Sequence, residues 1–155
     1  MRPRNVALRL AGVVGLLALP VAADAPADQY ERFDRESELI EDRKTRLDWD
    51  RYGVERNVPF NVVTLTCQTK SALQNVGRVP TVKELLTIVD EDPHDEYENS
   101  EGKTVKKAID RFAFPGTPVD SPYWTSTPAG PGQHWVVWFD TGLTEPRNDT
   151  AQAHL

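Results

Sequence analysis

The sequence has little cysteine, little histidine and no long hydrophobic run. Its 155 residues include one cysteine, Cys67, and three histidines, His94, His134 and His154, without the ligand spacing of a zinc site. The longest apolar stretch, residues 10–19, is shorter than the roughly 18 to 20 residues that a transmembrane helix needs. We therefore expect neither a cysteine-rich metal site nor a transmembrane span.

Positive charge is also scarce. The chain has 18 Lys and Arg against 24 Asp and Glu, which gives a formal net charge of −6. Affinity for nucleic acid depends on clustered Lys and Arg that contact phosphates, so nucleic acid is not an expected partner. The same acidity disfavours a strongly anionic polysaccharide.

The N-terminal residues have the three parts of a secretory signal. Residues 1–23 combine a basic start, an apolar stretch and small residues at Val21 and Ala23, just before Asp24. We expect this segment to be removed and the protein to be exported, to the periplasm, the cell exterior or the cell surface. Residues 24–155 then form one domain, and the loss of Arg2, Arg4 and Arg9 shifts the net charge from −6 to −9.

The first half of this domain predicts short strands and two helices. Residues 30–33 and 39–49 are strand-like, with a turn at 42–44, although residues 35–44 are charged enough to be helical. Residues 59–76 predict a helix with Val63, Leu65, Cys67 and Leu73 on one face. Thr81 and Glu84 have capping-box spacing, so a helix is predicted to begin after Thr81 and to end before Pro93. Its apolar face should consist of Val82, Leu85, Leu86 and Val89.

The second half predicts a solvated segment, a rigid loop and a hairpin. Residues 91–107 are almost wholly polar, and residues 134–139 lead through the turn 140–142 into a return strand. Strand alternation assigns two faces: a core face of Trp135, Val137 and Phe139, and a mixed face of His134, Val136, Trp138 and Asp140.

The loop predicted at residues 114–128 raises the question of what its aromatic residues do. Four prolines restrict its conformations, and Tyr123 and Trp124 are large apolar rings. Packing is the favoured interpretation for Trp124, and a sugar-stacking platform is the alternative. Trp138 is the better ligand-binding candidate, with His134 and Asp140 beside it, although a second small core would explain that face equally well.

Catalytic and metal sites receive little support. Ser126, His134 and Asp140 could be arranged as a nucleophile, a base and an acid, but no nucleophile-elbow motif accompanies them. No cofactor is expected. Calcium is a weak alternative to a solvated charge run, and its oxygen ligands would come from Asp90, Glu91, Asp92, Asp95, Glu96 and Glu98, or from Asp140, Glu145, Asn148 and Asp149.

An ordered set of motifs resembles the Lcl C-terminal domain family, the bacterial collagen-like adhesin domain long carried as a domain of unknown function. The motifs are I-E-D-x-x-T-x-L-x-W at 40–49, R-V-P-T-V-K-E-L-L at 78–86, A-I-D at 108–110, F-P-G-T-P at 114–118, Y-W-T-S-T-P at 123–128 and W-V-V-x-F at 135–139. The resemblance covers about residues 30–153.

The resemblance implies an α+β, C-type-lectin-like fold. Its two helices would pack on a small, twisted, mostly antiparallel sheet with long irregular loops. It also implies that Cys67 pairs with a cysteine beyond Leu155, because family members commonly end in a V-R-C-V strand where this chain has A-Q-A-H-L. In the adhesin the domain forms trimers and binds sulfated glycosaminoglycans, but the acidity of this chain argues against that ligand.

Three functions follow as hypotheses. The favoured one is an exported, non-catalytic binding or adhesion module that recognises a glycan or a cell-surface partner. One alternative is an enzyme related to the formylglycine-generating oxidases, which have a similar fold and a segment comparable to residues 78–86. Copper-dependent oxygen uptake would support this alternative. The other is a structural domain that only forms homo-oligomers.

Overall fold

The chain adopts an α+β fold in the computed structural model, which describes residues 28–32, 38–52, 57–69, 77–91, 93, 95–98 and 102–155. The predicted signal segment 1–23, helix positions 70–76 and His94 lie outside the described residues. The elements, in chain order, are β1 (Tyr30–Arg32), β2 (Leu39–Asp42), β3 (Leu47–Asp50), α1 (Phe60–Thr69), α2 (Val82–Leu86), β4 (Asp95–Glu98), β5 (Thr104–Lys107), β6 (Tyr123–Gly130), β7 (Gln133–Val137) and β8 (Thr144–Asn148). Neither α1 nor α2 is long and apolar enough to cross a membrane.

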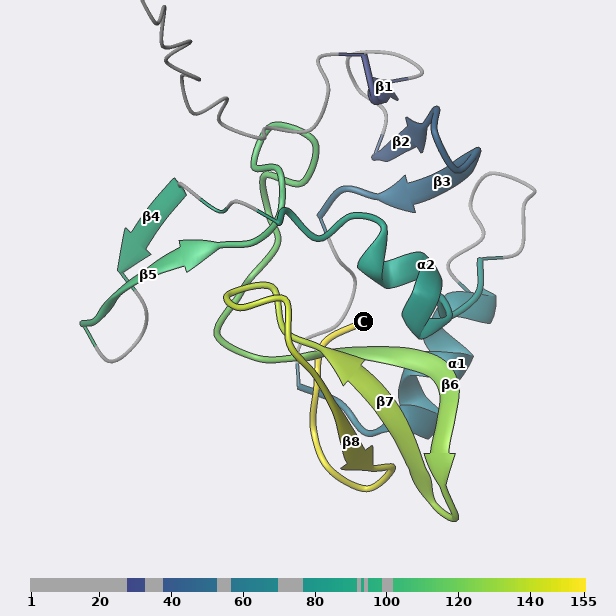
Figure 1. The fold of residues 1–155 in the computed structure, drawn as a ribbon. Helices are drawn as coiled ribbons and strands as arrows, with labels where there is room; N and C mark the ends of the chain where they lie inside the picture. Colours follow the sequence, from purple (N-terminus) through teal and green to yellow (C-terminus); the bar gives the residue numbers. More distant parts are fainter. Residues whose placement is uncertain are drawn as a thin grey trace, which may run out of the picture.

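The predicted α+β class and antiparallel pairing are confirmed. The described strands, however, form three sheets and not one: β1-β2-β3, β4-β5 and β6-β7-β8 (Figure 1). Every strand pair in them is antiparallel. The two three-stranded sheets lie at opposite ends of the view, with α2 between them.

The predicted N-terminal hairpin is confirmed, and a buried aspartate organises its turn. The Asp42 carboxylate accepts hydrogen bonds from the Lys44 backbone N–H (2.9 Å) and the Thr45 hydroxyl (2.7 Å). Arg46, with φ of 62°, then donates its N–H to the Asp42 carbonyl (2.7 Å). A buried acid is stable when both carboxylate oxygens have partners, as they do here.

Helix α1 is confirmed over its described residues, but its predicted buried face is wrong. Val63 is fully buried, and Cys67, one turn later, is partly buried against the same cluster. Leu65 is 61% exposed. Residues two apart on a helix lie on nearly opposite sides, so Val63 and Leu65 cannot share one face.

Helix α2 is shorter than predicted. Its capping box is confirmed, because Thr81 Oγ1 accepts the Glu84 N–H and the Glu84 carboxylate accepts the Thr81 N–H. The helix ends at Leu86, well before Pro93, and Leu86 is exposed. Val82 and Leu85 pack on the larger core from the helix, whereas Val89 reaches it through a turn and the isolated bridge with Ile109.

The capping box predicts an acid-sensitive contribution to stability. Arg78 Nη1 donates a hydrogen bond to Glu84 Oε2 (2.8 Å). This bond is the main cause that lowers the pKa of Glu84 from 4.5 to about 2, and the hydrogen bond from the Thr81 N–H is a smaller cause in the same direction. The stabilisation is therefore present above pH 4.5 and is lost as the pH falls towards 2. We expect Glu84→Gln to lower the free energy of unfolding by about 1–2 kcal/mol at neutral pH.

Urea unfolding measured across this acid range tests the expectation. The wild type should lose stability more steeply than Glu84→Gln, while Glu91→Gln, which changes an exposed carboxylate, should follow the wild type. Parallel acid profiles for the wild type and Glu84→Gln would show that the pKa shift contributes nothing to folding.

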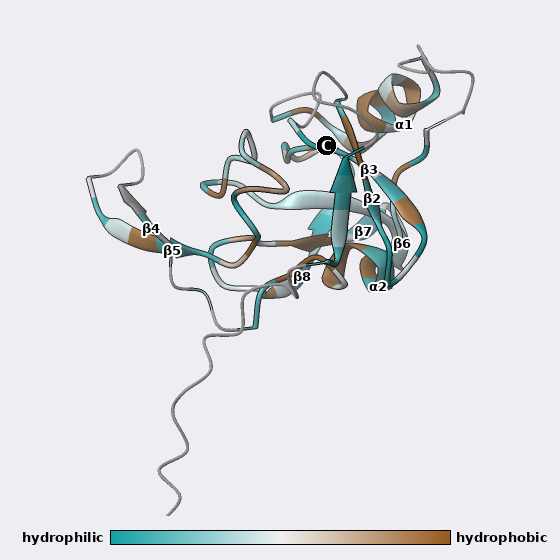
Figure 2. Cartoon of the chain, turned by 90° about the horizontal axis from the view of Figure 1, so that it is seen from above, coloured by the Kyte–Doolittle hydropathy of each residue, from teal (hydrophilic) through white to brown (hydrophobic). Residues whose placement is uncertain are grey.

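The polar segment 91–107 contains a hairpin that the sequence did not predict. Strands β4 and β5 project away from the rest of the chain in both views (Figures 1 and 2). Glu96 lies opposite Lys106, so an acidic strand faces a basic one. The Lys107 ammonium donates to the Thr117 carbonyl (3.3 Å), which ties the base of the hairpin to the body.

Successive residues of β6 and β7 point into two different cores, which lie on opposite faces of the C-terminal sheet. Tyr123 and Val137 belong to the larger core, and Trp124 and Val136 to the smaller one. The other buried members of the larger core are Ile40, Leu85, Ile88, Ile109, Ala113, Phe114, Val119 and Phe139. Those of the smaller core are Val63, Val79 and Ala153.

The segment predicted as an irregular loop includes strand β6. It pairs with β7 through register shifts on both sides of Pro128, which lets a proline occupy the strand. Its polar groups meet α2, since the Val82 N–H donates to Thr127 Oγ1 (3.0 Å) and the Ser126 N–H donates to the Pro80 carbonyl (2.7 Å). The second helix therefore packs on the tryptophan-bearing hairpin.

Residues 153 and 154 close the smaller core and pair with Val58 and with strand β6. Ala153 pairs antiparallel with Val58, and His154 pairs parallel with Tyr123. The backbone N–H of Trp124 donates to the His154 carbonyl (3.0 Å), and both Ala153 and His154 are buried. The A-Q-A-H-L segment thus takes a strand-like place beside β6.

Candidate functional site

Two of the predicted ligand-binding residues are buried. Trp124 is 1% exposed, and its indole Nε1–H donates to the Val58 carbonyl (2.8 Å). Tyr123 is buried against Phe139, and its hydroxyl donates to the Pro118 carbonyl (2.9 Å). Neither ring is open to a sugar, so burial removes both from the candidate site. This agrees with the packing interpretation of Trp124.

His134 links the start of α1 to the last turn of the chain. Its ring stacks on Phe60, with centroids 3.7 Å apart and planes 20° apart. Its Nδ1 lies 2.7 Å from Asp149 Oδ1, and the Phe60 N–H donates to the Asp149 carbonyl (3.0 Å). The acid that contacts His134 is thus Asp149 and not Asp140, so the nucleophile, base and acid imagined from the sequence are not assembled.

Trp138 lies just after β7 at the end of the hairpin and is half-buried. Its indole Nε1–H donates to Glu145 Oε1 (3.2 Å), an atom that also lies 3.5 Å from Arg147 Nη1. Asp140, in the turn itself, accepts the Thr141 hydroxyl (3.0 Å). We call Trp138, Asp140, Thr141, Leu143 and Glu145 the hairpin-end surface.

A tight turn positions this surface. The Gly142 N–H donates to the Trp138 carbonyl (2.8 Å), and the Trp138 N–H donates to the Leu143 carbonyl (2.9 Å). Gly142 has φ of +69°, and a Cβ there would lie 3.0 Å from Val89 Cγ1. Both conditions favour glycine over any residue with a side chain, so the predicted turn at 140–142 is confirmed with a packing reason for its glycine.

The carboxylates considered for calcium do not converge where the structure describes them. Across the described ranges, no group of three or more His, Cys, Asp or Glu side chains could hold a metal ion. In the second predicted group, Asp149 contacts His134, and Asn148 Oδ1 accepts both the N–H and the hydroxyl of Thr150. Asp92, from the first group, lies outside the described residues.

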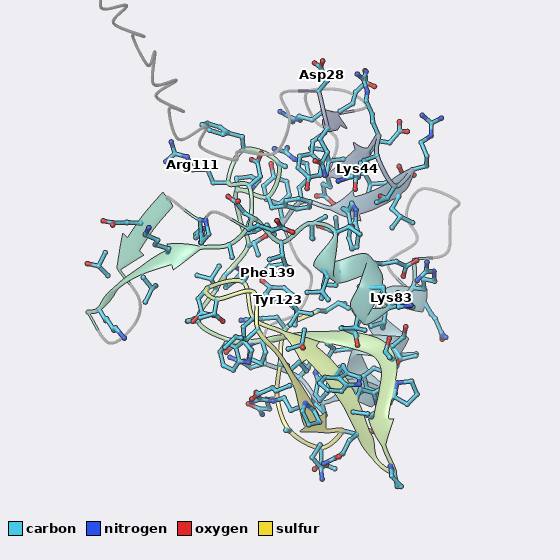
Figure 3. All side chains as sticks on the ribbon, viewed as in Figure 1. Asp28, Lys44, Lys83, Arg111, Tyr123 and Phe139 are labelled. Atoms are coloured by element: carbon cyan, nitrogen blue, oxygen red, sulfur yellow. The ribbon has the colours of Figure 1, made fainter. Side chains whose placement is uncertain are left out.

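Sequence reasoning missed an exposed aromatic pair. Tyr52 is 49% exposed and Phe112 is 76% exposed, and each is the third residue of an Asp-Arg-aromatic tripeptide, D-R-Y at 50–52 and D-R-F at 110–112. Figure 3 shows Arg111 far from the β6–β8 sheet. The repeated tripeptide was a signal that could have revealed the pair.

Comparison with known proteins gives a family but no relatives. Nothing among the curated proteins or the solved structures matches the chain. The family of the Lcl C-terminal domain matches residues 38–155, which include every element from β2 to β8 and the segment that closes the smaller core. The motifs quoted from the sequence lie in this range, and the chain belongs to the Lcl C-terminal domain family.

Proposed function

We propose that this protein is an exported, non-catalytic binding module of C-type-lectin-like fold that recognises a glycan through the hairpin-end surface. The observation that carries the proposal is the partly exposed indole of Trp138, fixed by its hydrogen bond to Glu145. A sugar offers an apolar ring face and peripheral hydroxyls, so it suits an aromatic ring flanked by polar groups.

The surroundings of the indole support this assignment. The Glu145 carboxylate and the Asp140–Thr141 pair supply acceptors and a hydroxyl for sugar hydroxyl groups. Leu143, 65% exposed on the same turn, extends the apolar area. Because the turn is held by two backbone hydrogen bonds, little conformational entropy is lost when a ligand binds.

A glycan array probed with the purified protein tests the proposal. We expect binding to at least one glycan, and a loss of about tenfold or more in affinity for Trp138→Ala. Leu65→Ser, which changes an exposed apolar residue on α1, is the matched control and should bind as the wild type does.

Circular dichroism of each variant separates a binding defect from misfolding. A folded Trp138→Ala variant that binds its glycan with wild-type affinity would remove the hairpin-end surface from the function. No binding to any glycan by the folded wild type would reject glycan recognition altogether.

A further inference from the structure

We propose that the hairpin-end surface selects glycans that carry a positively charged amino group, that is, amino sugars whose nitrogen is not acetylated. This inference rests on the glycan recognition proposed above and names the ligand class of the same surface. Its basis is the contact between the indole of Trp138 and the carboxylate of Glu145, in a turn whose other charged residue, Asp140, is also acidic.

A carboxylate lies at the edge of the partly exposed indole. The Trp138 Nε1–H donates to Glu145 Oε1 (3.2 Å), and the Glu145 side chain is 49% exposed. The other Glu145 oxygen, Oε2, accepts no hydrogen bond from any residue that the structure describes. The indole is the aromatic ring that attracts a cation most strongly, and a carboxylate beside it adds a direct ionic attraction. Trp138 and Glu145 therefore offer an ammonium group both kinds of interaction.

Asp140 brings a second carboxylate to the same turn. Both neighbours of Trp138, Val137 and Phe139, are buried in the larger core, so the indole points away from that core. Asp140 is two residues from Trp138, which limits the separation of their Cα atoms to about 7 Å. Asp140 is partly exposed and forms no ion pair with any Lys, Arg or His in the described ranges. Its negative charge therefore acts on a ligand that covers the indole.

Arg147 supplies positive charge nearby but does not neutralise the surface. Its Nη1 lies 3.5 Å from Glu145 Oε1, and its side chain is 29% exposed. In the β7–β8 register Arg147 lies opposite His134, whereas Glu145 lies opposite Val136 and so closer to the turn. Two carboxylates with one guanidinium, placed on the side away from the turn, leave the end of the hairpin negatively charged.

The hydrogen-bonding groups of the surface indicate the same ligand. Ionised carboxylates only accept hydrogen bonds, and the indole N–H is already donated to Glu145. An ammonium group brings three donors and a positive charge, so it satisfies these acceptors better than a neutral amide does. The net charge of −6 adds a long-range attraction for cations and a repulsion for sulfated sugars. An amino sugar offers both a ring face to the indole and an amine to the carboxylates.

Calorimetric titration with two matched trisaccharides tests the proposal. The probes are the trimers of glucosamine and of N-acetylglucosamine, which have the same sugar skeleton and differ in the charge on the nitrogen. At about pH 6, where amines are protonated and carboxylates ionised, we expect the glucosamine trimer to bind about tenfold more tightly. Added salt should reduce this preference, because salt screens exposed charges.

Charge-removing variants assign the preference to the hairpin end. Glu145→Gln keeps an oxygen that can accept the indole N–H, and both it and Asp140→Asn should reduce the preference for the glucosamine trimer about threefold. Arg147→Gln should instead increase affinity for that trimer about twofold, because it removes a competing cation. Asp48→Asn is the matched control: it removes an exposed carboxylate from β3, in the sheet at the other end of the molecule (Figure 1), and should bind as the wild type does.

The outcomes separate this inference from the proposed function. If the acetylated trimer or another glycan binds through Trp138 and the glucosamine trimer binds no more tightly, selection for the amino group is refuted while glycan recognition stands. A preference that survives in the double variant of Glu145→Gln and Asp140→Asn arises elsewhere on the chain and also refutes the inference. Absence of binding by every glycan rejects both proposals.

Discussion

Replacement of Trp124 by alanine is expected to lower the free energy of unfolding by about 4–5 kcal/mol. The indole fills the smaller core between Val63 and Val136 and makes an edge contact with Phe60, with centroids 5.6 Å apart. Its loss leaves a cavity and removes one of two hydrogen-bond donors to the Val58 carbonyl, the other being the Ala153 N–H. A domain is usually stable by only about 5–15 kcal/mol, so this variant should be close to unfolding.

Urea unfolding of three variants measures the effect and separates its causes. Trp124→Phe keeps an aromatic ring but not the indole N–H, so it should lose about 1–3 kcal/mol. Trp138→Ala, the matched control at a partly exposed tryptophan, should lose less than about 1 kcal/mol. If Trp124→Ala were no less stable than Trp138→Ala, the smaller core would not support the fold.

Replacement of Arg51 by methionine is expected to cost about 2–4 kcal/mol. The guanidinium is buried and bonds the carbonyls of Phe112 and Ala113, and methionine would leave both without their charged donor. Arg51→Lys should recover little stability, because a single ammonium cannot reproduce the planar guanidinium that serves two carbonyls. Urea unfolding gives the free energies.

Arg111→Ala is the control for this substitution. It removes an exposed arginine from the second Asp-Arg-aromatic tripeptide and should change stability by less than about 0.5 kcal/mol. Amide hydrogen exchange at Phe112 and Ala113 should accelerate more in Arg51→Met than in Arg111→Ala, because Arg51 bonds the carbonyls of both residues while Asp110 accepts their N–H groups in either variant. Equal stability of the two variants would mean that the hydrogen bonds from Arg51 to these carbonyls have no energetic role.

The parts of the fold that could be predicted are those encoded by short sequence patterns. The Asp42 turn, the Thr81–Glu84 capping box and the turn at Gly142 each depend on side chains a few residues apart, so a local reading is sufficient. The alternation along β7 also placed Val137 and Phe139 in the larger core, but Trp135, assigned to the same face, is only partly buried, and Val136, assigned to the mixed face, is fully buried in the smaller core.

The parts that could not be predicted depend on distant contacts. Leu86 points to solvent because the chain leaves the helix after it to pair Val89 with Ile109. Strand β6 forms despite its prolines because the pairing with β7 accommodates them by register shifts. Likewise His134 meets Asp149, and Arg51 meets Phe112, only after the chain has folded back over itself.

The contact of Val58 with Ala153 has a consequence for the order of folding during synthesis. The two residues are joined by backbone hydrogen bonds of 3.0 and 3.2 Å, yet most of the chain separates them. The smaller core therefore lacks Ala153, one of its buried residues, until position 153 has been synthesised and folds back on Val58. Until position 154 follows, the Trp124 backbone N–H has no His154 carbonyl to donate to, so we expect this edge of β6 to need protection by a chaperone.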